Sequence, residues 1–170
     1  MVRIGILGIG FMGTTHFKAI GELGTAKVTA VCTRDKKKRE GDWTGIKGNF
    51  GDSGGVHDLT GIHKHTVIDD LINDHDVDLV DICLPSPMHA DVAITALRAG
   101  KHVLCEKPIA LSLKDADRML DTATQHGKHL MVGQVLRFFP EFALIKHLAD
   151  AGEYGRIVGA HLKRIISKPE

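Results

Sequence analysis

Cysteines, aromatic side chains and long apolar runs are all scarce in this chain of 170 residues. Three scattered cysteines do not make a disulfide framework, which favours a reducing compartment such as the cytoplasm. The sequence has no run of about 18 apolar residues, so it predicts no transmembrane helix and no membrane partner. The N-terminal sequence MVRIGILGIG lacks the apolar core of a signal peptide, so we expect a cytoplasmic protein.

The sequence also lacks an excess of one charge, because 22 Lys and Arg residues face 21 Asp and Glu residues. A net charge of +1 gives no overall attraction for nucleic acid, and any anion-binding site must therefore be local. The apolar and charged fractions, 43% and 25%, are ordinary for a soluble globular protein and argue against wholesale disorder. This length fits one domain, or one domain and part of another.

What the sequence does contain is a regular alternation of strand and helix patterns. Residues 2–9 predict a buried strand, residues 11–23 a helix ended by Gly24, and residues 27–32 a second strand, which together make one βαβ unit. This alternation predicts an α/β fold of the Rossmann type, a doubly wound parallel sheet. The elements expected after the first unit are a helix at 67–72, a strand at 77–84, a helix at 89–99, a strand at 101–105, a helix at 112–125 and a strand at 130–135.

Residues 36–61 interrupt this alternation. A KKKRE run is followed by seven glycines between Gly41 and Gly61, and the apolar residues among them show no steady period. We therefore expect a long surface excursion, which is unusual inside a compact domain. The apolar residues concerned are Trp43, Ile46, Phe50 and Val56.

The sequence Gly8-Ile9-Gly10-Phe11-Met12-Gly13 follows the first predicted strand and opens the first helix. This G-x-G-x-x-G pattern is weak alone, but its position here is the one in which it binds a dinucleotide. The first glycine allows the tight turn, the second lets a pyrophosphate approach the backbone, and the third lets helix and strand pack closely. The N–H groups at the helix start then hold the phosphates. A glycine turn without a ligand is the alternative.

The end of the second strand bears on the choice between NAD and NADP. An NAD site usually has Asp or Glu about 20 residues after the last glycine, whereas this chain has Thr33 and Arg34 there. A guanidinium binds a 2′-phosphate bidentately, and the lysines at 36–38 add positive charge, so we favour NADP over NAD. In the alternative, Arg34 and the lysines are solvated and Asp35 reaches the ribose instead.

Two short motifs follow later strands, at the edge where ligands bind in doubly wound sheets. Pro85-Ser86-Pro87-Met88-His89 ends one strand, and Glu106-Lys107-Pro108 ends the next. A lysine held there can donate to a substrate oxygen or help to move its proton. An ion pair between Glu106 and Lys107 at a surface turn is the alternative.

These motifs together resemble the glucose-fructose oxidoreductase / inositol dehydrogenase / rhizopine-catabolism (Gfo/Idh/MocA) superfamily of NAD(P)-dependent oxidoreductases. The stretches that carry the resemblance are IGILGIGFMG, DLVDICLPSPMHADVAITALRAGKHVLCEKPIA and GQVLRFFPEF, in the order and at the approximate spacing of that superfamily. The resemblance implies hydride transfer between the nicotinamide of NADP or NAD and a carbon of a sugar- or cyclitol-like polyol. It also implies a homo-oligomer.

The resemblance further implies roles for single residues. Lys107 would be catalytic and would contact both nicotinamide and substrate. Thr33 and Arg34 would face the adenosine ribose, and Gln134 and Arg137 would lie near the nicotinamide. The full cofactor-binding set would be Gly8, Gly10, Phe11, Met12, Gly13, Thr33, Arg34, Leu84, Pro85, His89, Glu106, Lys107, Gln134 and Arg137.

Beyond residue 135 the pattern changes to a helix at 140–148 and a strand candidate at 156–166. We predict a dinucleotide-binding Rossmann domain at residues 1–133, followed at residues 134–170 by a linker helix and the first strand of an incomplete α+β domain. A lone strand has no partner for its backbone hydrogen bonds, so we expect a truncated chain. Superfamily members are much longer, and the Asp and His that assist their lysine would follow residue 170.

Two functions follow from this sequence. The first is an NAD(P)-dependent oxidoreductase of CH–OH groups as the full-length protein, with this chain inactive alone. The second is a dinucleotide-binding module that does no chemistry, such as a regulator.

Histidines are numerous, and the spacings of His63/His65 and His126/His129 suit metal binding. No cysteine or carboxylate completes either pair at ligand spacing along the sequence. We therefore assign no metal site and expect solvated or hydrogen-bonded histidines.

Overall fold

The computed structural model describes residues 1–48, 54–163 and 165. The chain divides into two compact units, Met1–Gly133 and Gln134–Glu170. The helices of the described residues are too short or too polar to span a bilayer.

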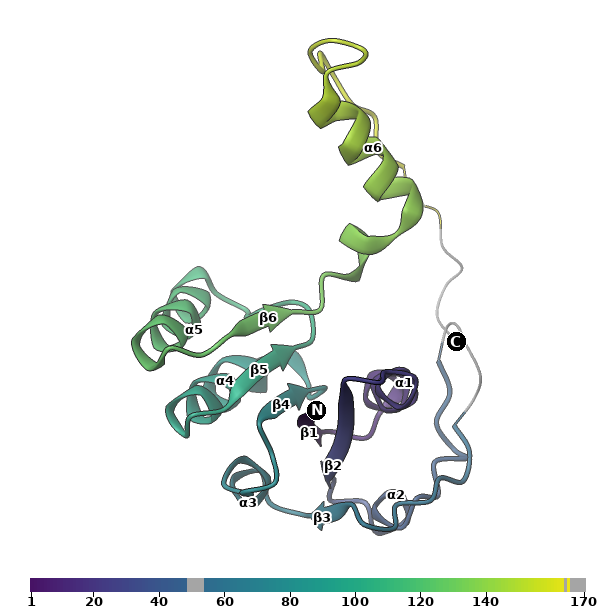
Figure 1. Ribbon diagram of the computed structural model, residues 1–170, viewed down its shortest axis with the longest axis vertical. Helices are drawn as coiled ribbons and strands as arrows, with labels where there is room; N and C mark the ends of the chain where they lie inside the picture. Colours follow the sequence, from purple (N-terminus) through teal and green to yellow (C-terminus); the bar gives the residue numbers. More distant parts are fainter. Residues whose placement is uncertain (49–53, 164, 166–170) are drawn as a thin grey trace. The chain divides into compact units, whose positions relative to one another are not determined.

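Six parallel strands form one sheet in the first unit, in the order β3-β2-β1-β4-β5-β6 (Figure 1). The chain moves outward from β1 first in one direction and then, from β4, in the other. This is the doubly wound Rossmann arrangement, and the predicted fold class is confirmed. The strands are β1 (Val2–Leu7), β2 (Ala26–Cys32), β3 (His63–His65), β4 (Leu79–Ile82), β5 (His102–Cys105) and β6 (Leu130–Val132).

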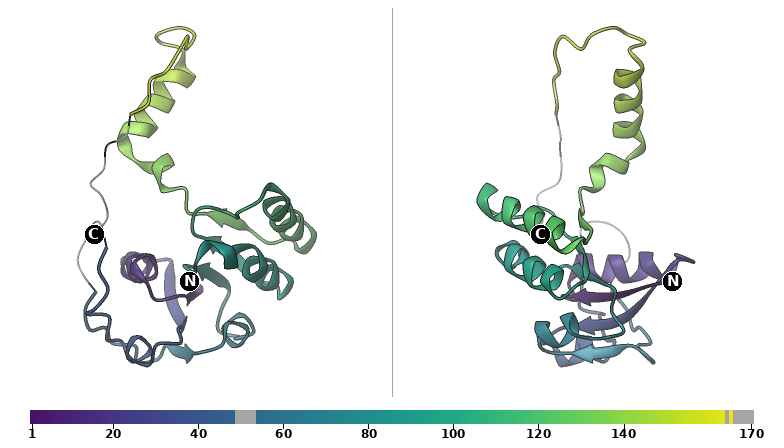
Figure 2. Two further views of the ribbon diagram at one scale, coloured as in Figure 1. Left: turned by 180° about the vertical axis from the view of Figure 1, so that it is seen from behind. Right: turned by 60° about the vertical axis from the view of Figure 1, so that its left-hand side comes forward.

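Helices cover both faces of the sheet, and each face has its own apolar core (Figures 1 and 2). On one face α1 (Phe11–Gly21) packs together with the segment that follows α2 (Lys36–Arg39). On the other face lie α3 (Ile68–Ile72), α4 (His89–Arg98) and α5 (Leu113–His126).

The residues of β1 contribute to both cores in turn. Ile4 and Ile6 belong to the cluster on the α1 face, whereas Leu7 belongs to the cluster on the opposite face. Ile6 and Leu7 are fully buried, and each such side chain stabilises the fold by about 1.5–3 kcal/mol through burial. A parallel strand covered on both sides therefore needs a continuous apolar run, and that run predicted this strand.

Helix α5 begins and ends at signals that the sequence contains. The hydroxyl of Ser112 accepts from the N–H of Asp115 at 3.1 Å and donates to its carboxylate at 2.7 Å. Gly127 ends the helix in the left-handed conformation, with φ of +60°. The predicted helix, residues 112–125, differs from α5 by one residue at each end, because a capping residue marks its start and a glycine marks its end.

The sequence prediction missed β3. Its three residues, His63, Lys64 and His65, pair only with β2, at one edge of the sheet. A short polar edge strand shows no apolar period, so no sequence pattern distinguished it from a loop.

We predicted that residues 36–61 lie on the surface. This prediction was wrong for three apolar side chains of the segment, which are buried in the core. Trp43 is fully buried, and Ile46 and Leu59 are 7% and 4% exposed. Trp43 packs edge-on against Phe17 of α1, with ring centroids 4.9 Å apart, and donates from Nε1 to the carbonyl oxygen of Lys38 at 2.7 Å. The inward residues show no period because the glycine-rich chain turns between them.

Val56 and Phe50 are the other two apolar residues of the predicted excursion. Val56 forms an isolated antiparallel bridge with Asp42, and its side chain is 79% exposed, as expected for an excursion. Phe50 lies outside the described residues.

The second unit contains a short 3-10 helix, Val135–Phe138, and α6 (Pro140–Ala151), so the predicted helix at 140–148 is confirmed. Residues 156–163 and 165 have no regular secondary structure. The strand predicted at 156–166 is therefore not formed in the part of it that the structure describes, and residues 164 and 166 lie outside that part. A strand needs a neighbouring strand for its backbone hydrogen bonds.

Candidate functional site

The turn between β1 and α1 is built so closely that two of its glycines have no room for a side chain. Gly8 has φ of +93°, and a Cβ there would lie 2.6 Å from the carbonyl oxygen of Cys83, at the end of β4. A Cβ on Gly13 would lie 2.0 Å from the carbonyl oxygen of Gly8. The glycines thus bring the start of α1 against the carboxyl ends of β1 and β4.

Gly10 differs from both, because nothing lies within 4 Å of the position its Cβ would take. It is the N-terminal cap of α1, and no side chain caps this helix. Phe11 and Met12 continue the first turn and are partly buried. An open backbone at a helix start, with the helix dipole behind it, fits a phosphate group.

The turn after β2 is held by its own side chains. Arg39 donates from Nη1 to the carbonyl oxygens of Thr33 and Arg34, both at 2.9 Å. The hydroxyl of Thr33 accepts from the N–H of Asp35 at 3.3 Å. The Asp35 carboxylate accepts from the N–H of Lys38 at 3.2 Å and caps α2. One oxygen of the Asp35 carboxylate, Oδ1, is therefore hydrogen-bonded within its own turn.

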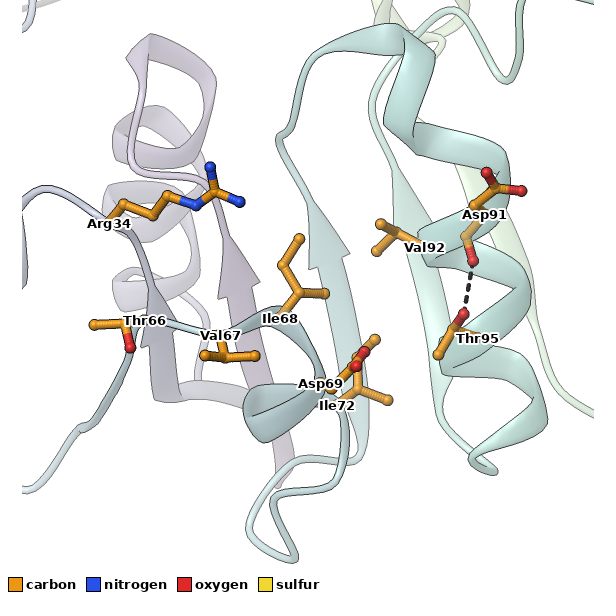
Figure 3. Close-up of a pocket in the computed structure, with 9 residues that line it drawn as sticks. All are labelled: Arg34, Thr66, Val67, Ile68, Asp69, Ile72, Asp91, Val92 and Thr95. Carbon is orange, nitrogen blue, oxygen red and sulfur yellow. Dashed lines mark hydrogen bonds between the residues drawn. The ribbon is translucent and has the colours of Figure 1, made fainter.

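A pocket of about 390 Å³ opens beside this turn, between α3 and α4 (Figure 3). Arg34 extends its guanidinium over the space above Ile68, and Val67 and Val92 add apolar lining. The volume lies within the range of small-molecule sites, and the lining combines the Arg34 cation with the carboxylates of Asp69 and Asp91 and with apolar side chains.

The segment after β4 is tied to the segment after β5 by one histidine. His89 is 1% exposed, with Nδ1 2.7 Å from the carbonyl oxygen of Pro108 and Nε2 2.8 Å from that of Leu84. Leu84 is partly buried against the core on the α4 side, whereas Pro85 is exposed. Both nitrogens of His89 therefore point to backbone, and the ring fixes the Glu-Lys-Pro turn relative to β4.

Glu106 lies buried at the end of β5, with an exposed fraction of 5%. Its Oε2 accepts from the N–H of Lys107 at 3.1 Å. Its Oε1 lies 3.2 Å from Nε2 of His16, an ion-pair contact without hydrogen-bond alignment. Nδ1 of His16 lies 2.8 Å from a carboxylate oxygen of Asp81, which is fully buried in β4. His16 thus joins α1 to two acidic side chains beneath the glycine turn.

The charges around His16 favour its protonated form. Burial lowers the pKa of His16, but the hydrogen bond from Asp81 and the nearby charges of Asp81 and Glu106 outweigh it and raise the pKa above 6.5. Cys83 lies beside this group, and burial raises the pKa of its thiol, so it stays protonated.

Lys107 itself is exposed at the carboxyl end of β5. The ion pairs of the described residues do not include one between Lys107 and Glu106. The buried carboxylate is instead directed to His16 and to the Lys107 backbone.

Gln134 and Arg137 belong to the second unit, at the start of the short helix Val135–Phe138, and both are exposed. Their contact with a cofactor stays a prediction.

Sequence reasoning missed three residues that organise this site, namely His16, Asp81 and Arg39. His16 was assigned only to the apolar stripe of the first helix. Its place three residues after Gly13 is the one signal that could have drawn attention to it, because that position follows the glycine turn by about one helical turn.

A glycine turn from β1 into α1, at the carboxyl edge of a doubly wound parallel sheet, defines a dinucleotide-binding protein of the Rossmann class. Residues 2–134 match the oxidoreductase family with an NAD-binding Rossmann fold, GFO_IDH_MocA. The chain therefore belongs to this family.

Several similar proteins are inositol dehydrogenases. Inositol 2-dehydrogenase of Salmonella typhimurium is 31% identical over 164 residues, which are 94% of this chain and 45% of that protein. Myo-inositol 2-dehydrogenase of Thermotoga maritima is 33% identical over 169 residues, 98% of this chain and 45% of that protein. This chain spans less than half the length of either relative.

A solved structure shows the same arrangement. Scyllo-inositol dehydrogenase from Lactobacillus casei, with bound NAD(H) and scyllo-inositol, superposes with a TM-score of 0.76 at 28% identity. The match covers 91% of this chain and 42% of that one.

Proposed function

We propose that this chain is the nucleotide-binding part of an NAD(P)-dependent oxidoreductase that transfers a hydride between nicotinamide and a CH–OH carbon of a cyclitol- or sugar-like polyol. The observation that carries the proposal is the open Gly10 backbone at the start of α1, set between two glycines that admit no side chain. The inositol dehydrogenases among the relatives support the substrate class. We further propose a cytoplasmic homo-oligomer without nucleic-acid partners.

In this proposal the glycine turn binds the pyrophosphate and the turn after β2 binds the adenosine end. The nicotinamide, when bound, supplies the carbon that accepts or gives the hydride. Glu106, held by His16 and the Lys107 backbone, lines the nicotinamide end. His89 acts as a positioning residue, because its ring holds the Glu-Lys-Pro turn through two carbonyl oxygens.

Lys107 is the catalytic residue of the proposal. It is exposed at the carboxyl end of β5, where its ammonium form would donate to a substrate oxygen and its neutral amine form would receive a proton from a substrate hydroxyl. We propose that Gln134 and Arg137 approach the same end of the cofactor from residues 134–170, a linker helix and the start of a second domain.

We also propose a preference for NADP over NAD. Arg34 points into the pocket, while the Asp35 carboxylate caps α2 and is not directed to a ribose. A guanidinium there would bind a 2′-phosphate. The Lactobacillus casei relative has NAD(H) bound, so the turn after β2 is where this chain would differ from it.

The test of dinucleotide binding is Gly10→Asp. The substitution places a negative charge where the pyrophosphate would lie, while aspartate is a good helix cap and has open space there. We expect the fold to remain stable and the affinity for NADPH, followed by its fluorescence, to fall at least about tenfold.

Gly24→Asp is the matched control, because Gly24 also has open space and lies beyond the other end of α1. It adds the same charge and should leave NADPH affinity unchanged. Wild-type chain that shows no saturation up to millimolar NADPH would contradict the proposal and favour a glycine turn without a ligand.

The second candidate function is a non-catalytic dinucleotide-binding module. The exposed ammonium group of Lys107 above a buried carboxylate favours the enzyme, because a module that only binds does not need it.

A further inference from the structure

Two histidines and one aspartate meet in the first unit, away from the glycine turn. His63 and His65 are two apart on β3, so both side chains leave the same face of the strand. Nδ1 of His63 lies 2.7 Å, and Nε2 of His65 2.9 Å, from the same oxygen, Oδ2 of Asp74. Both histidines are hydrogen-bonded, as expected, and the fold supplies a carboxylate, Asp74, that no ligand spacing along the sequence indicated.

The surroundings hold this group in place. The other carboxylate oxygen of Asp74 accepts from the N–H of Asp76 at 2.9 Å, which leaves Oδ2 directed at the imidazoles. Lys101 donates from Nζ to the backbone oxygens of Asp74 and Val77, at 2.8 and 2.7 Å, and fixes the loop between α3 and β4. In metal-binding sites of proteins, the ligands are oriented by further hydrogen bonds of this kind.

Charge and access also suit a cation. The Asp74 side chain is 4% exposed, whereas the imidazole of His63 is 45% exposed, so the group is anchored inside and open outside. Asp76 adds a second carboxylate, with Oδ2 3.9 Å from Nε2 of His63. The exposed ring of His75 lies 3.4 Å from the same oxygen.

We propose that His63 Nδ1, His65 Nε2 and Asp74 Oδ2 form a binding site for a divalent transition-metal ion of the Zn²⁺ class. Two imidazole nitrogens and a carboxylate oxygen are a donor set that Zn²⁺ takes, and three protein ligands leave a fourth position for water or an outside ligand. The three atoms lie within 4.8 Å of one another. Zinc–ligand bonds of about 2.1 Å place ligand atoms about 3.4 Å apart, so the two N–O separations of 2.7 and 2.9 Å would each widen by about 0.5–0.7 Å on binding.

The ion would link the edge strand β3 to the loop that leads into the amino end of β4. The glycine turn follows the carboxyl end of β1 instead, so this site does not share residues with the dinucleotide site.

The experiment titrates Zn²⁺ into tag-free wild-type chain by calorimetry at about pH 8, where protons compete little with Zn²⁺ for an ordinary imidazole. We expect one Zn²⁺ per chain. His65→Gln and Asp74→Asn should each weaken Zn²⁺ binding at least about tenfold, since each removes one ligand. The matched control is His129→Gln. The ring of His129 stacks on that of His102, with centroids 5.1 Å apart, so this variant also removes one imidazole from a histidine pair. It should leave the affinity unchanged.

Absence of binding up to millimolar Zn²⁺ would overturn the proposal, as would a His65→Gln variant that binds like wild type. Because Asp74→Asn alters a buried side chain and can affect folding, a second measurement uses only the wild-type chain. In nuclear magnetic resonance spectra of the imidazoles, one equivalent of Zn²⁺ should shift the signals of His63 and His65. Shifts confined to other histidines would also overturn the proposal.

Discussion

Arg34 is the residue on which the proposed preference for NADP depends. Its guanidinium extends over the pocket, and its backbone carbonyl oxygen accepts from Arg39, which fixes the backbone from which the side chain extends. A phosphate held by a guanidinium gains about 1.5–3 kcal/mol from each charged hydrogen bond.

We expect Arg34→Ala to weaken NADPH binding at least about tenfold and to change NADH binding less than about twofold. Fluorescence titration with both cofactors measures the two affinities. Arg98→Ala, at the exposed end of α4, removes a cation elsewhere and should alter neither. An unchanged ratio of the two affinities in Arg34→Ala would show that Arg34 does not select NADP.

His16 makes the stability of the fold depend on pH. Because its pKa is raised in the folded chain, its contribution to stability is fully present below about pH 6.5 and is lost as the pH rises through the folded-state pKa. Above that pKa the neutral ring can donate to only one of Asp81 and Glu106.

We therefore expect His16→Gln to destabilise the chain more at pH 6 than at about pH 9, as measured by urea unfolding across that range. His126→Gln, on the exposed end of α5, should change the unfolding free energy by less than about 0.5 kcal/mol at every pH. A His16→Gln effect that is independent of pH would mean that the ring acts only through packing.

The glycine-rich segment after α2 shows how a single buried side chain can hold an irregular element. Trp43 is fully buried against Phe17 and His57, and its indole N–H is satisfied by a backbone oxygen. Backbone hydrogen bonds within the segment, from the N–H of Trp43 to the oxygen of Gly55 at 2.8 Å and from the N–H of His57 to the oxygen of Gly41 at 2.9 Å, add to this anchor.

Trp43→Ala should lower the unfolding free energy by about 3–5 kcal/mol, because it removes a large buried side chain and leaves a cavity. Val56→Ala is the control, since Val56 lies in the same segment but is 79% exposed, and its effect should stay within about 0.5 kcal/mol. Denaturant unfolding measures both. Similar values for the two variants would show that the segment contributes little to the core.

The elements that sequence analysis predicted well are those with a continuous apolar run or a helical stripe and a clear end signal. Val2–Leu7, α4 and α5 are examples. It failed at β3 and at Trp43, where the contacts that decide the structure join residues far apart in the chain. The glycine turn and the Glu-Lys-Pro segment were located because their chemistry is local, whereas the contacts of His16 and Asp74 arise only from folding.

At the scale of the whole molecule, the chain spans less than half the length of its inositol dehydrogenase relatives. The proposed site contains the glycine turn, which would bind the cofactor, and one exposed lysine, Lys107.

We expect the purified chain of 170 residues to bind NADPH but to show no turnover of myo-inositol with NADP or NAD, measured by absorbance of the reduced cofactor. The binding measurement serves as the control, because it shows that the chain is folded and loaded. Robust reduction of the cofactor by this chain alone would show that its own residues make a complete catalytic set.

The two edges of the sheet have a consequence for the behaviour of the protein at high concentration. Both edge strands, β3 and β6, contain three residues, and β3 carries Lys64 between two histidines. A second copy that added a strand at either edge would gain few backbone hydrogen bonds and, at β3, would meet charged side chains. The sheet is therefore protected against growing into filaments by strand addition, although its buried strands are among the most apolar segments of the chain.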